Sequence, residues 1–316
     1  MRFLIIKNLT IHYMRCVALG LTVLSCSHVK MFPSPSPKTS SPPTPSPIPS
    51  ASVDKALGSY CYETLKKLPG KYHKARLRKA CSRVLLKEGC VSPKNRSIFH
   101  YDKLSERVGG TRILVLALIH GDEFPSGSVA RAWMERLEEL DPRNSWRVIP
   151  VANPDGLVLK TRTNANRVDI NRNFPTENWD QLALKMWKER YKSTWRKYPG
   201  PAPASEVETR CLMAHIKDFS SDFIISIHTP LGHLDFDGPK MKYPNFNLLP
   251  WRRFGHFPGS LGRYMWKDHG IPVLTVELKG NDPIKSFEVL DNLQDISGTL
   301  AIKALDRSKA SSKASH

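Results

Sequence analysis

Residues 113–123 have the sequence ILVLALIHGDE, seven apolar residues that are followed at once by a histidine, a glycine and two acids. A continuous apolar run of this length is typical of a strand that is buried on both faces. The next residues, 126–140, have the apolar spacing of an amphipathic helix. A buried strand that leads into a helix is the unit from which α/β domains are built, so this stretch indicates the fold class.

The same alternation of strands and helices continues along the chain. Apolar runs predict strands over 146–152, 223–227 and 272–276, and a helix is predicted over 206–219. We therefore expect an α/β fold over residues 97–305, in which helices flank a mixed, mostly parallel central sheet.

Polar residues stand where three of these strands end. The first strand ends in His120, with Glu123 three residues later. The strand FIISI ends in His228, and the strand PVLTV ends in Glu277. Ligands of open α/β sheets bind beyond the carboxyl ends of the strands. Each of these residues alone also fits an ion pair or a hydrogen bond at a strand end, but together they favour a metal site.

Two imidazoles and one carboxylate are a usual catalytic zinc set, which leaves a fourth position open to water. We therefore predict one Zn2+ per chain, held by His120, Glu123 and His228. Glu277 is the spare carboxylate that can take a proton from that water as the catalytic base.

Several motifs, in this order along the chain, resemble those of the zinc carboxypeptidase (funnelin) family between residues 97 and 304. They are HGDE at 120–123, NPDG at 153–156, KTRTNANRVDINRNFP at 160–175, SIH at 226–228 and TVEL at 275–278. HGDE, GPAPASE at 200–206 and FPGSLG at 257–262 are most similar to the murein peptide amidase branch. The resemblance implies a hydrolase of a peptide or γ-glutamyl amide bond next to a free carboxylate. In that branch the bond is the γ-D-glutamyl–diaminopimelate bond of cell-wall peptides.

The resemblance also assigns roles to three polar residues. Arg162 matches the arginine that polarises the scissile carbonyl and stabilises the oxyanion that develops there. Asn171 and Arg172 match the pair that grips the terminal carboxylate of the substrate. An arginine suits this role because its planar fork can donate two parallel hydrogen bonds to a carboxylate.

Two further positions concern the choice of substrate. We suggest that Asp235 or Asp237 holds the free amino group of diaminopimelate, and a turn-capping role is the alternative. Digestive carboxypeptidases carry a tyrosine over the substrate, for which Tyr243 and Tyr264 are candidates without a clear motif.

Residues 1–26 are typical of an export signal. They contain the apolar run CVALGLTVLS at 16–25, which is too short to span a bilayer comfortably. The run leads into VLSC, which resembles a bacterial lipobox with Cys26 as the lipidated residue. An ordinary signal that is cleaved nearby and a simple N-terminal anchor are the alternatives. We expect an exported protein, either periplasmic, held at the outer membrane by a lipid anchor, or secreted.

Three other segments complete the expected organisation. Residues 27–53 contain PSPSPKTSSPPTPSPIPS and should form an extended tether, because proline fixes φ and removes hydrogen-bond donors. Residues 54–96 are expected to be a basic, cysteine-containing helical segment, with two helices around the turn at Pro69 and Gly70. Residues 306–316 are expected to be a basic polar tail.

The charge of the chain favours anionic partners. Lys and Arg outnumber Asp and Glu by 48 to 29, which gives a formal net charge of +19. The basic side chains between residues 66 and 87 offer a surface for an anionic cell-wall polymer, or they are the solvated face of a helix pair. Export excludes nucleic acid as a partner.

Four cysteines lie outside the signal region: Cys61, Cys81, Cys90 and Cys211. They allow three pairings, and we expect at least one disulfide, with Cys61 joined to Cys81 or Cys90.

Two other functions stay open at this stage. One is a protein carboxypeptidase, a deglutamylase or a small-molecule deacylase with the same zinc site. The other is a non-catalytic wall-binding lipoprotein, which would not need the complete set of ligands and base that this chain carries.

Overall fold

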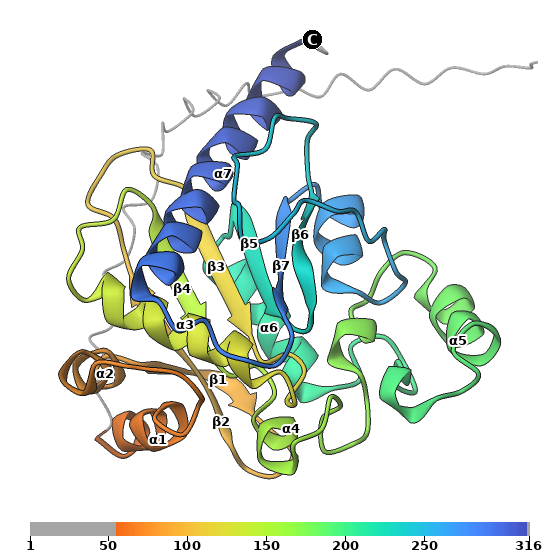
Figure 1. Ribbon diagram of the computed structural model, residues 1–316. Coiled ribbons are helices and arrows are strands. Elements are labelled where there is room, and N and C mark those ends of the chain that lie inside the picture. The colour runs from red at the N-terminus through yellow and green to blue at the C-terminus, as the bar shows by residue number, and fades with distance from the viewer. Residues whose placement is uncertain (1–54, 315–316) are drawn as a thin grey trace, which may run out of the picture. The chain divides into compact units, whose positions relative to one another are not determined.

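A computed structural model describes residues 55–314 of the chain (Figure 1). Its helices, in chain order, are α1 (Lys55–Leu65), α2 (Lys74–Cys81), α3 (Phe124–Leu137), α4 (Pro154–Leu159), η1 (Ile170–Arg172), α5 (Trp179–Glu189), η2 (Trp195–Lys197), α6 (Val207–Asp218), η3 (Arg263–Asp268) and α7 (Phe287–Ala314). Its strands are β1 (Leu85–Val91), β2 (Ser97–Lys103), β3 (Arg112–Ala117), β4 (Ser145–Ile149), β5 (Phe223–His228), β6 (Leu231–Asp237) and β7 (Val273–Lys279). The signal, Cys26 and the tether lie outside the described residues.

The seven strands form one sheet in the order β1-β2-β4-β3-β5-β7-β6. The four central strands, β4, β3, β5 and β7, are parallel, and the outer strands pair antiparallel at both sides. This mixed, mostly parallel sheet confirms the fold class. Because the central strands run the same way, the residues that follow β3 and β5 emerge at one edge of the sheet, beside the middle of β7.

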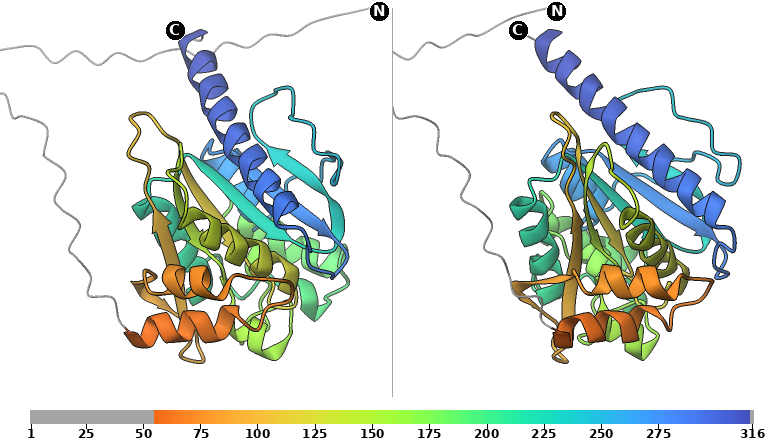
Figure 2. Two further views of the ribbon diagram at one scale, coloured as in Figure 1. Left: turned by 60° about the vertical axis from the view of Figure 1, so that its left-hand side comes forward. Right: turned by 90° about the vertical axis from the view of Figure 1, so that its left-hand side faces the viewer.

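Helices cover both faces of the sheet, and the side chains of β3 show how the core is divided. Ile113 and Val115 belong to the apolar core under α3 and α7, whereas Leu114 and Leu116 belong to the core under α6. Figure 2 shows the same layers, with α6 on one side of the sheet and α3 and α7 on the other. Burial on both faces explains why these strands appear in the sequence as continuous apolar runs.

The segment 54–96, expected to be helical, is helical only in its first part. The helices α1 and α2 flank the expected turn, and both pack against α3. The remainder forms β1, which pairs with β2 and so extends the main sheet. In β1 the sequence LLKEGCV mixes polar and apolar residues, because one side of this edge strand faces solvent.

Several of the basic side chains between residues 66 and 87 have acidic partners. These ion pairs are Lys66–Glu63, Arg76–Glu139, Lys79–Glu138, Arg83–Glu138 and Lys87–Asp218. Most of them join the segment to the loop after α3 or to the end of α6. A good part of the positive charge therefore fixes the segment to the domain.

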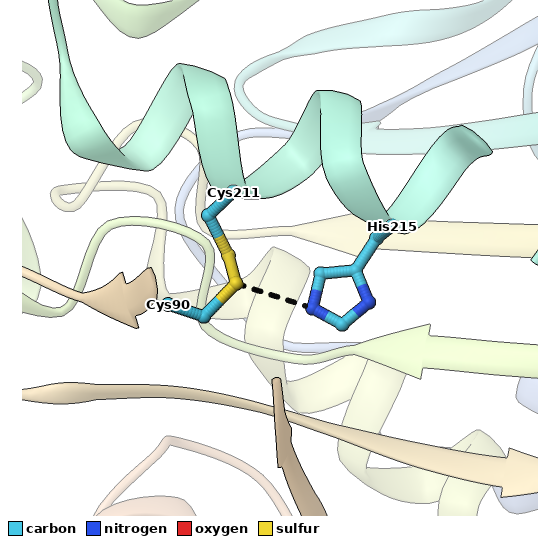
Figure 3. Close-up of side chains that lie close together, drawn as sticks. All are labelled: Cys90, Cys211 and His215. Atoms are coloured by element: carbon cyan, nitrogen blue, oxygen red, sulfur yellow. Dashed lines mark hydrogen bonds between the residues drawn. A yellow bond between two sulfur atoms is a disulfide. The ribbon is translucent and has the colours of Figure 1, made fainter. Parts of the chain in front are cut away.

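Two disulfides join the four cysteines, which confirms the expectation of at least one. Cys61–Cys81 links α1 to α2, and Cys90–Cys211 links β1 to α6 across 121 residues. Figure 3 shows the second disulfide with the ring of His215, whose Nε2 lies 3.5 Å from the Cys90 sulfur. Cys90 and Cys211 are at most 3% exposed.

A buried polar network continues from this disulfide. The ring of His215 packs against that of His100, with centroids 4.6 Å apart. Arg147 lies beside His215 and donates hydrogen bonds to Asp102 and Asp218. Burial, followed by the charge of Arg147, lowers the pKa of His100 to about 3. Burial, followed by His100 and Arg147, lowers the pKa of His215 to about 3, so both rings are neutral at pH 7.

The end of the chain, expected to be a basic polar tail at 306–316, is helical as far as Ala314. The helix α7 continues through residue 306 to Ala314, so the tail is an extension of the helix that covers the sheet. Among the described helices, none is both long and apolar enough to cross a membrane.

Candidate active site

His120, Glu123 and His228 meet at the edge of the sheet, as the strand ends predicted. Glu123 bridges the two rings: its Oε1 lies 2.8 Å from the Nδ1 of His120, and its Oε2 lies 2.9 Å from the Nδ1 of His228. The two Nδ1 atoms are 3.2 Å apart. All three residues are buried, and their ligand atoms form one compact group.

The turn that carries His120 and Glu123 depends on a close approach between two glycines. A Cβ on Gly121 would lie 2.0 Å from the carbonyl carbon of Gly156. The HGDE turn can therefore pack directly on the backbone of the NPDG segment only because Gly121 lacks a side chain. This contact places His120 beside the loop that supplies the arginines of the site.

The outward nitrogen of each histidine ring also has a partner. The Nε2 of His120 lies 3.1 Å from Asp169 Oδ1, and the Nε2 of His228 lies 2.9 Å from the Ser226 hydroxyl. Such partners fix the orientation of a metal-binding imidazole and leave the opposite nitrogen free to bind. Two imidazoles, one carboxylate and these outer contacts fit a Zn2+ ion.

The electrostatics of this group favour its charged forms. Burial alone would raise the pKa of Glu123, but the two histidines outweigh burial and hold that pKa well below its usual range. Burial would likewise lower the pKa of His228, and Glu123 raises it instead. The carboxylate of Glu123 is therefore ionised and ready to bind a cation.

Arg162 lies beside this group and is held by Asp169. Its Nε donates a 3.0 Å hydrogen bond to Asp169 Oδ2, and one guanidinium nitrogen lies 3.5 Å from Glu123 Oε1. Asp169 is fully buried, and Arg162 and His120 together keep its pKa well below the usual range in spite of burial. Asp169 thus orients both a candidate ligand and a candidate catalytic arginine, although no sequence motif assigned a role to it.

Glu277 lies on β7 directly beside His228 of β5, because the two residues are paired in the parallel register. The backbone N–H of Leu231 lies 3.4 Å from Glu277 Oε2. The carboxylate therefore faces the same pocket as the two histidines.

Asn171 and Arg172 come from η1, one turn after Asp169. Asn171 Oδ1 accepts a 2.9 Å hydrogen bond from the backbone N–H of Leu261, which leaves its amide N–H groups free to donate. The guanidinium of Arg172 packs over the ring of Phe257 at 4.9 Å, and its Nε is buried without a partner among the described residues. Both residues can donate hydrogen bonds to an anion.

Asp235 and Asp237 point to the same side of β6. Asp235 is 3% exposed, and its Oδ1 has no hydrogen-bond partner within the described part of the chain. Asp237 Oδ1 lies 3.3 Å from the Nδ1 of His256. Burial, and then the charge of Asp237, raises the pKa of Asp235 to about 6, and burial raises the pKa of Asp237 to about 6. A cation between them would therefore be stabilised.

Every predicted site residue of the folded domain lines one pocket of about 350 Å³. The predicted site residues among those that line it are His120, Glu123, Arg162, Asn171, Arg172, His228, Asp235, Asp237 and Glu277. Neither predicted tyrosine is among the lining residues, since Tyr243 stacks on Trp251 and Tyr264 on Phe174. Tyr191 and Lys197 line the pocket instead, and no motif in the sequence singled them out.

Comparison with known proteins concerns the family of the chain. Residues 83–230 match the zinc carboxypeptidase family. The chain is 33% identical to murein peptide amidase A of Vibrio campbellii over 175 residues, which are 53% of this chain and 69% of that protein. It is 34% identical to murein peptide amidase A of Escherichia coli K12 over 124 residues, which are 39% of this chain and half of that protein.

Solved structures show the same fold at lower identity. Thrombin-activatable fibrinolysis inhibitor has a TM-score of 0.59 at 15% identity, with 79% of this chain and 80% of that chain covered. Carboxypeptidase A of Helicoverpa armigera has a TM-score of 0.51 at 17% identity, with 81% and 79% covered. On the sequence matches given above, the chain belongs to the zinc carboxypeptidase family and is a hydrolase of peptide or amide bonds.

Proposed function

We propose that this protein is a zinc-dependent metallopeptidase that cleaves an amide bond next to a free carboxylate, with the γ-D-glutamyl–diaminopimelate bond of murein peptides as its substrate. The observation that carries the proposal is the charge pattern of the pocket. Arg162 and Arg172 lie near the two histidines, whereas Asp235 and Asp237 form a separate acidic wall. Diaminopimelate in such a peptide has carboxylates and one free amino group, which match both walls.

His120, Glu123 and His228 would hold one zinc ion. When bound, zinc supplies Lewis-acid chemistry: it lowers the pKa of water and polarises a carbonyl oxygen. The three residues are in place for it because Glu123 already bridges the two rings and Asp169 and Ser226 hold them from behind.

The catalytic steps follow from the residues that surround this centre. Glu277 accepts a proton from the attacking water and then passes it to the leaving amine nitrogen. Arg162 donates hydrogen bonds to the carbonyl oxygen as negative charge develops there. Asp169 keeps Arg162 in position, so the cation does not have to move during the reaction.

Substrate binding uses the two walls of the pocket. Arg172 and the amide of Asn171 bind the carboxylate next to the scissile bond. Asp235 and Asp237 bind the ammonium at the far end of diaminopimelate, which favours the ionised form of both carboxyl groups. Neutral or acidic residues at the C-terminus would leave these buried acids unpaired and would bind less well.

We further propose that the enzyme acts outside the cytoplasm, in the periplasm or at the outer membrane. The apolar run at 16–25, the lipobox-like VLSC and the proline-rich tether support this location. Lipidation at Cys26 would anchor the domain near its murein substrate.

The test is the cleavage of L-Ala-γ-D-Glu-diaminopimelate by the purified protein, with and without a chelator, followed by mass spectrometry. We expect free diaminopimelate to be released in the presence of zinc only. A matched peptide that ends in 2-aminopimelate, which lacks the distal amino group, should be cleaved more slowly. If the zinc-loaded protein releases no diaminopimelate, the proposed substrate is wrong.

A further inference from the structure

Lys197 lies in the wall of the active-site pocket without a role in the proposed reaction. It ends the short helix η2, and its side chain is half-buried. The segment around it is fixed to the site at two points. The carbonyl oxygen of Tyr198 accepts a 2.8 Å hydrogen bond from the N–H of Asp169, and Arg196 forms a 2.9 Å ion pair with Asp122 of the HGDE turn. The segment that carries Lys197 is thus attached to Asp169 and to the HGDE turn.

The ammonium group has no anionic partner of its own. Within residues 55–307, no hydrogen bond or ion pair joins its Nζ to another group, and the ring of Tyr191 lies 5.9 Å from it. Its electrostatic neighbours include the cations Arg162 and Arg172. Burial, and then the charge of Arg162, lowers the pKa of Lys197 to about 8. Three cations are therefore gathered at one side of the pocket, which is unfavourable until anions bind there.

The acidic groups nearby do not balance this charge. Asp169 is already hydrogen-bonded to His120 and Arg162, and Glu123 is bound to the two histidines. Asp235 and Asp237 belong to the other wall, where burial is the main influence on both pKa values, followed by Asp237 for Asp235 and by Arg253 for Asp237. An anion for Lys197 must therefore come with the ligand.

We propose that Lys197 is a specificity-determining residue that binds a second carboxylate of the substrate, in addition to the one bound by Asn171 and Arg172. This inference rests on the proposed function, because it concerns a substrate with more than one carboxylate. A lysine suits the role, since its ammonium is a compact charge on a flexible stem that can reach a carboxylate without a fixed plane.

The proposed tripeptide offers this carboxylate in two places. One is the α-carboxylate that a γ-linked glutamyl residue leaves free on the acyl side of the scissile bond. The other is the distal carboxylate of diaminopimelate. Ordinary α-linked peptides have neither at the corresponding atoms, so contact with Lys197 would select against them.

The experiment compares three peptides: the tripeptide, the same peptide with the glutamyl α-carboxylate amidated, and the same peptide with the distal diaminopimelate carboxylate amidated. Each is tested on the wild type, Lys197→Gln and Lys197→Arg. Lys188→Gln serves as the control, because Lys188 lies exposed on the neighbouring helix α5 and does not line the pocket.

We expect Lys197→Gln to lower kcat/KM for the unmodified tripeptide about 10- to 100-fold, mainly through KM, as for the loss of a hydrogen bond to a charged group. Lys197→Arg should restore most of this loss. One of the two amidated peptides should show the same loss with the wild type and no further loss with Lys197→Gln. That peptide identifies the carboxylate. Equal losses by Lys197→Gln on all three peptides would overturn the proposal.

Binding of the same peptides to Glu277→Gln, measured by calorimetry, separates this inference from the proposed function. If Glu277→Gln binds the tripeptide in a manner that depends on Lys197 while the wild type does not cleave it, the reaction is wrong and the carboxylate site stands. If the wild type cleaves the tripeptide and Lys197→Gln changes neither binding nor KM, the inference about Lys197 is wrong. If the tripeptide neither binds nor is cleaved, both are wrong.

Discussion

Two buried groups in this domain bring three possible metal ligands together, and only one of them has the properties of a metal site. The first is His120, Glu123 and His228, and the second is Cys90, Cys211 and His215. In the first group the Nε2 atom of each histidine has a hydrogen-bond partner, and all three residues line the pocket. In the second group the two sulfur atoms are bonded to each other.

The charges of the two groups differ as much as their access. In the first group the carboxylate of Glu123 lies against both rings, whereas in the second burial, His100 and Arg147 lower the pKa of His215. An anion among imidazoles attracts a cation, but an arginine beside them repels one. Ligand atoms that lie close together are therefore not sufficient for a metal site; the outer contacts and the local charge decide.

The largest effect expected from this difference concerns zinc content. His228→Ala should lose the metal and with it all detectable release of diaminopimelate, because two protein ligands hold zinc far more weakly than three. His215→Ala should keep one zinc per chain. Metal analysis after dialysis checks both variants. Loss of zinc from His215→Ala alone would reverse the assignment of the two groups.

The next effect separates binding of the metal from catalysis. Glu277→Gln should retain one zinc per chain but lower kcat by about 10³- to 10⁴-fold, since the amide cannot accept the proton of the attacking water. Steady-state kinetics at matched zinc content provide the measurement. Turnover close to that of the wild type would exclude Glu277 as the base.

The disulfide of the second group should affect stability and leave activity almost unchanged. Cys90→Ala with Cys211→Ala should lower the free energy of unfolding by about 4–5 kcal/mol, because the bond closes a loop of 121 residues. The Cys61–Cys81 disulfide closes a loop of only 20 residues, so Cys61→Ala with Cys81→Ala should lower the free energy of unfolding by about 3 kcal/mol. Urea unfolding measures both values, and the opposite order would contradict a structural role based on loop closure.

The smallest effect is a dependence of stability on pH. The pKa values of His100 and His215 are about 3 in the folded protein, below the value of about 6.5 in an unfolded chain. The unfolded state therefore binds more protons between these values, so stability falls as pH decreases from about 6.5 towards 3. His215→Gln should weaken this decrease between pH 6 and pH 4 by about 1–2 kcal/mol. An unchanged slope would mean that His215 is not neutral in the folded state.

The parts of the site that follow central strands could be predicted from the sequence, because continuous apolar runs reveal where such strands end. His120, His228 and Glu277 are of this kind. Asp169 could not be found in this way, since its importance depends on which ring nitrogen of His120 faces away from the cluster. Lys197 follows no periodic pattern and enters the pocket only through the contacts of its loop.

The edges of the fold escaped prediction for a related reason. Strands β1, β2 and β6 lie outside the four parallel strands, and their polar residues on one face hide the apolar pattern. The pairing of Cys90 with Cys211 also depends on the register of β1 beside α6, which no spacing along the chain contains. The signal and Cys26 remain predictions.

The attachment of β1 has a practical meaning for anyone who wishes to produce the enzyme. A truncation at residue 97, the expected start of the catalytic domain, would remove an edge strand, one disulfide entirely and half of the other. It would also strip α1 and α2 from α3 and uncover apolar side chains beneath them, such as the buried Phe99, whose ring packs against that of Tyr60. The smallest recombinant product that keeps these contacts therefore begins upstream of Lys55, and shorter products should be recovered as insoluble aggregates.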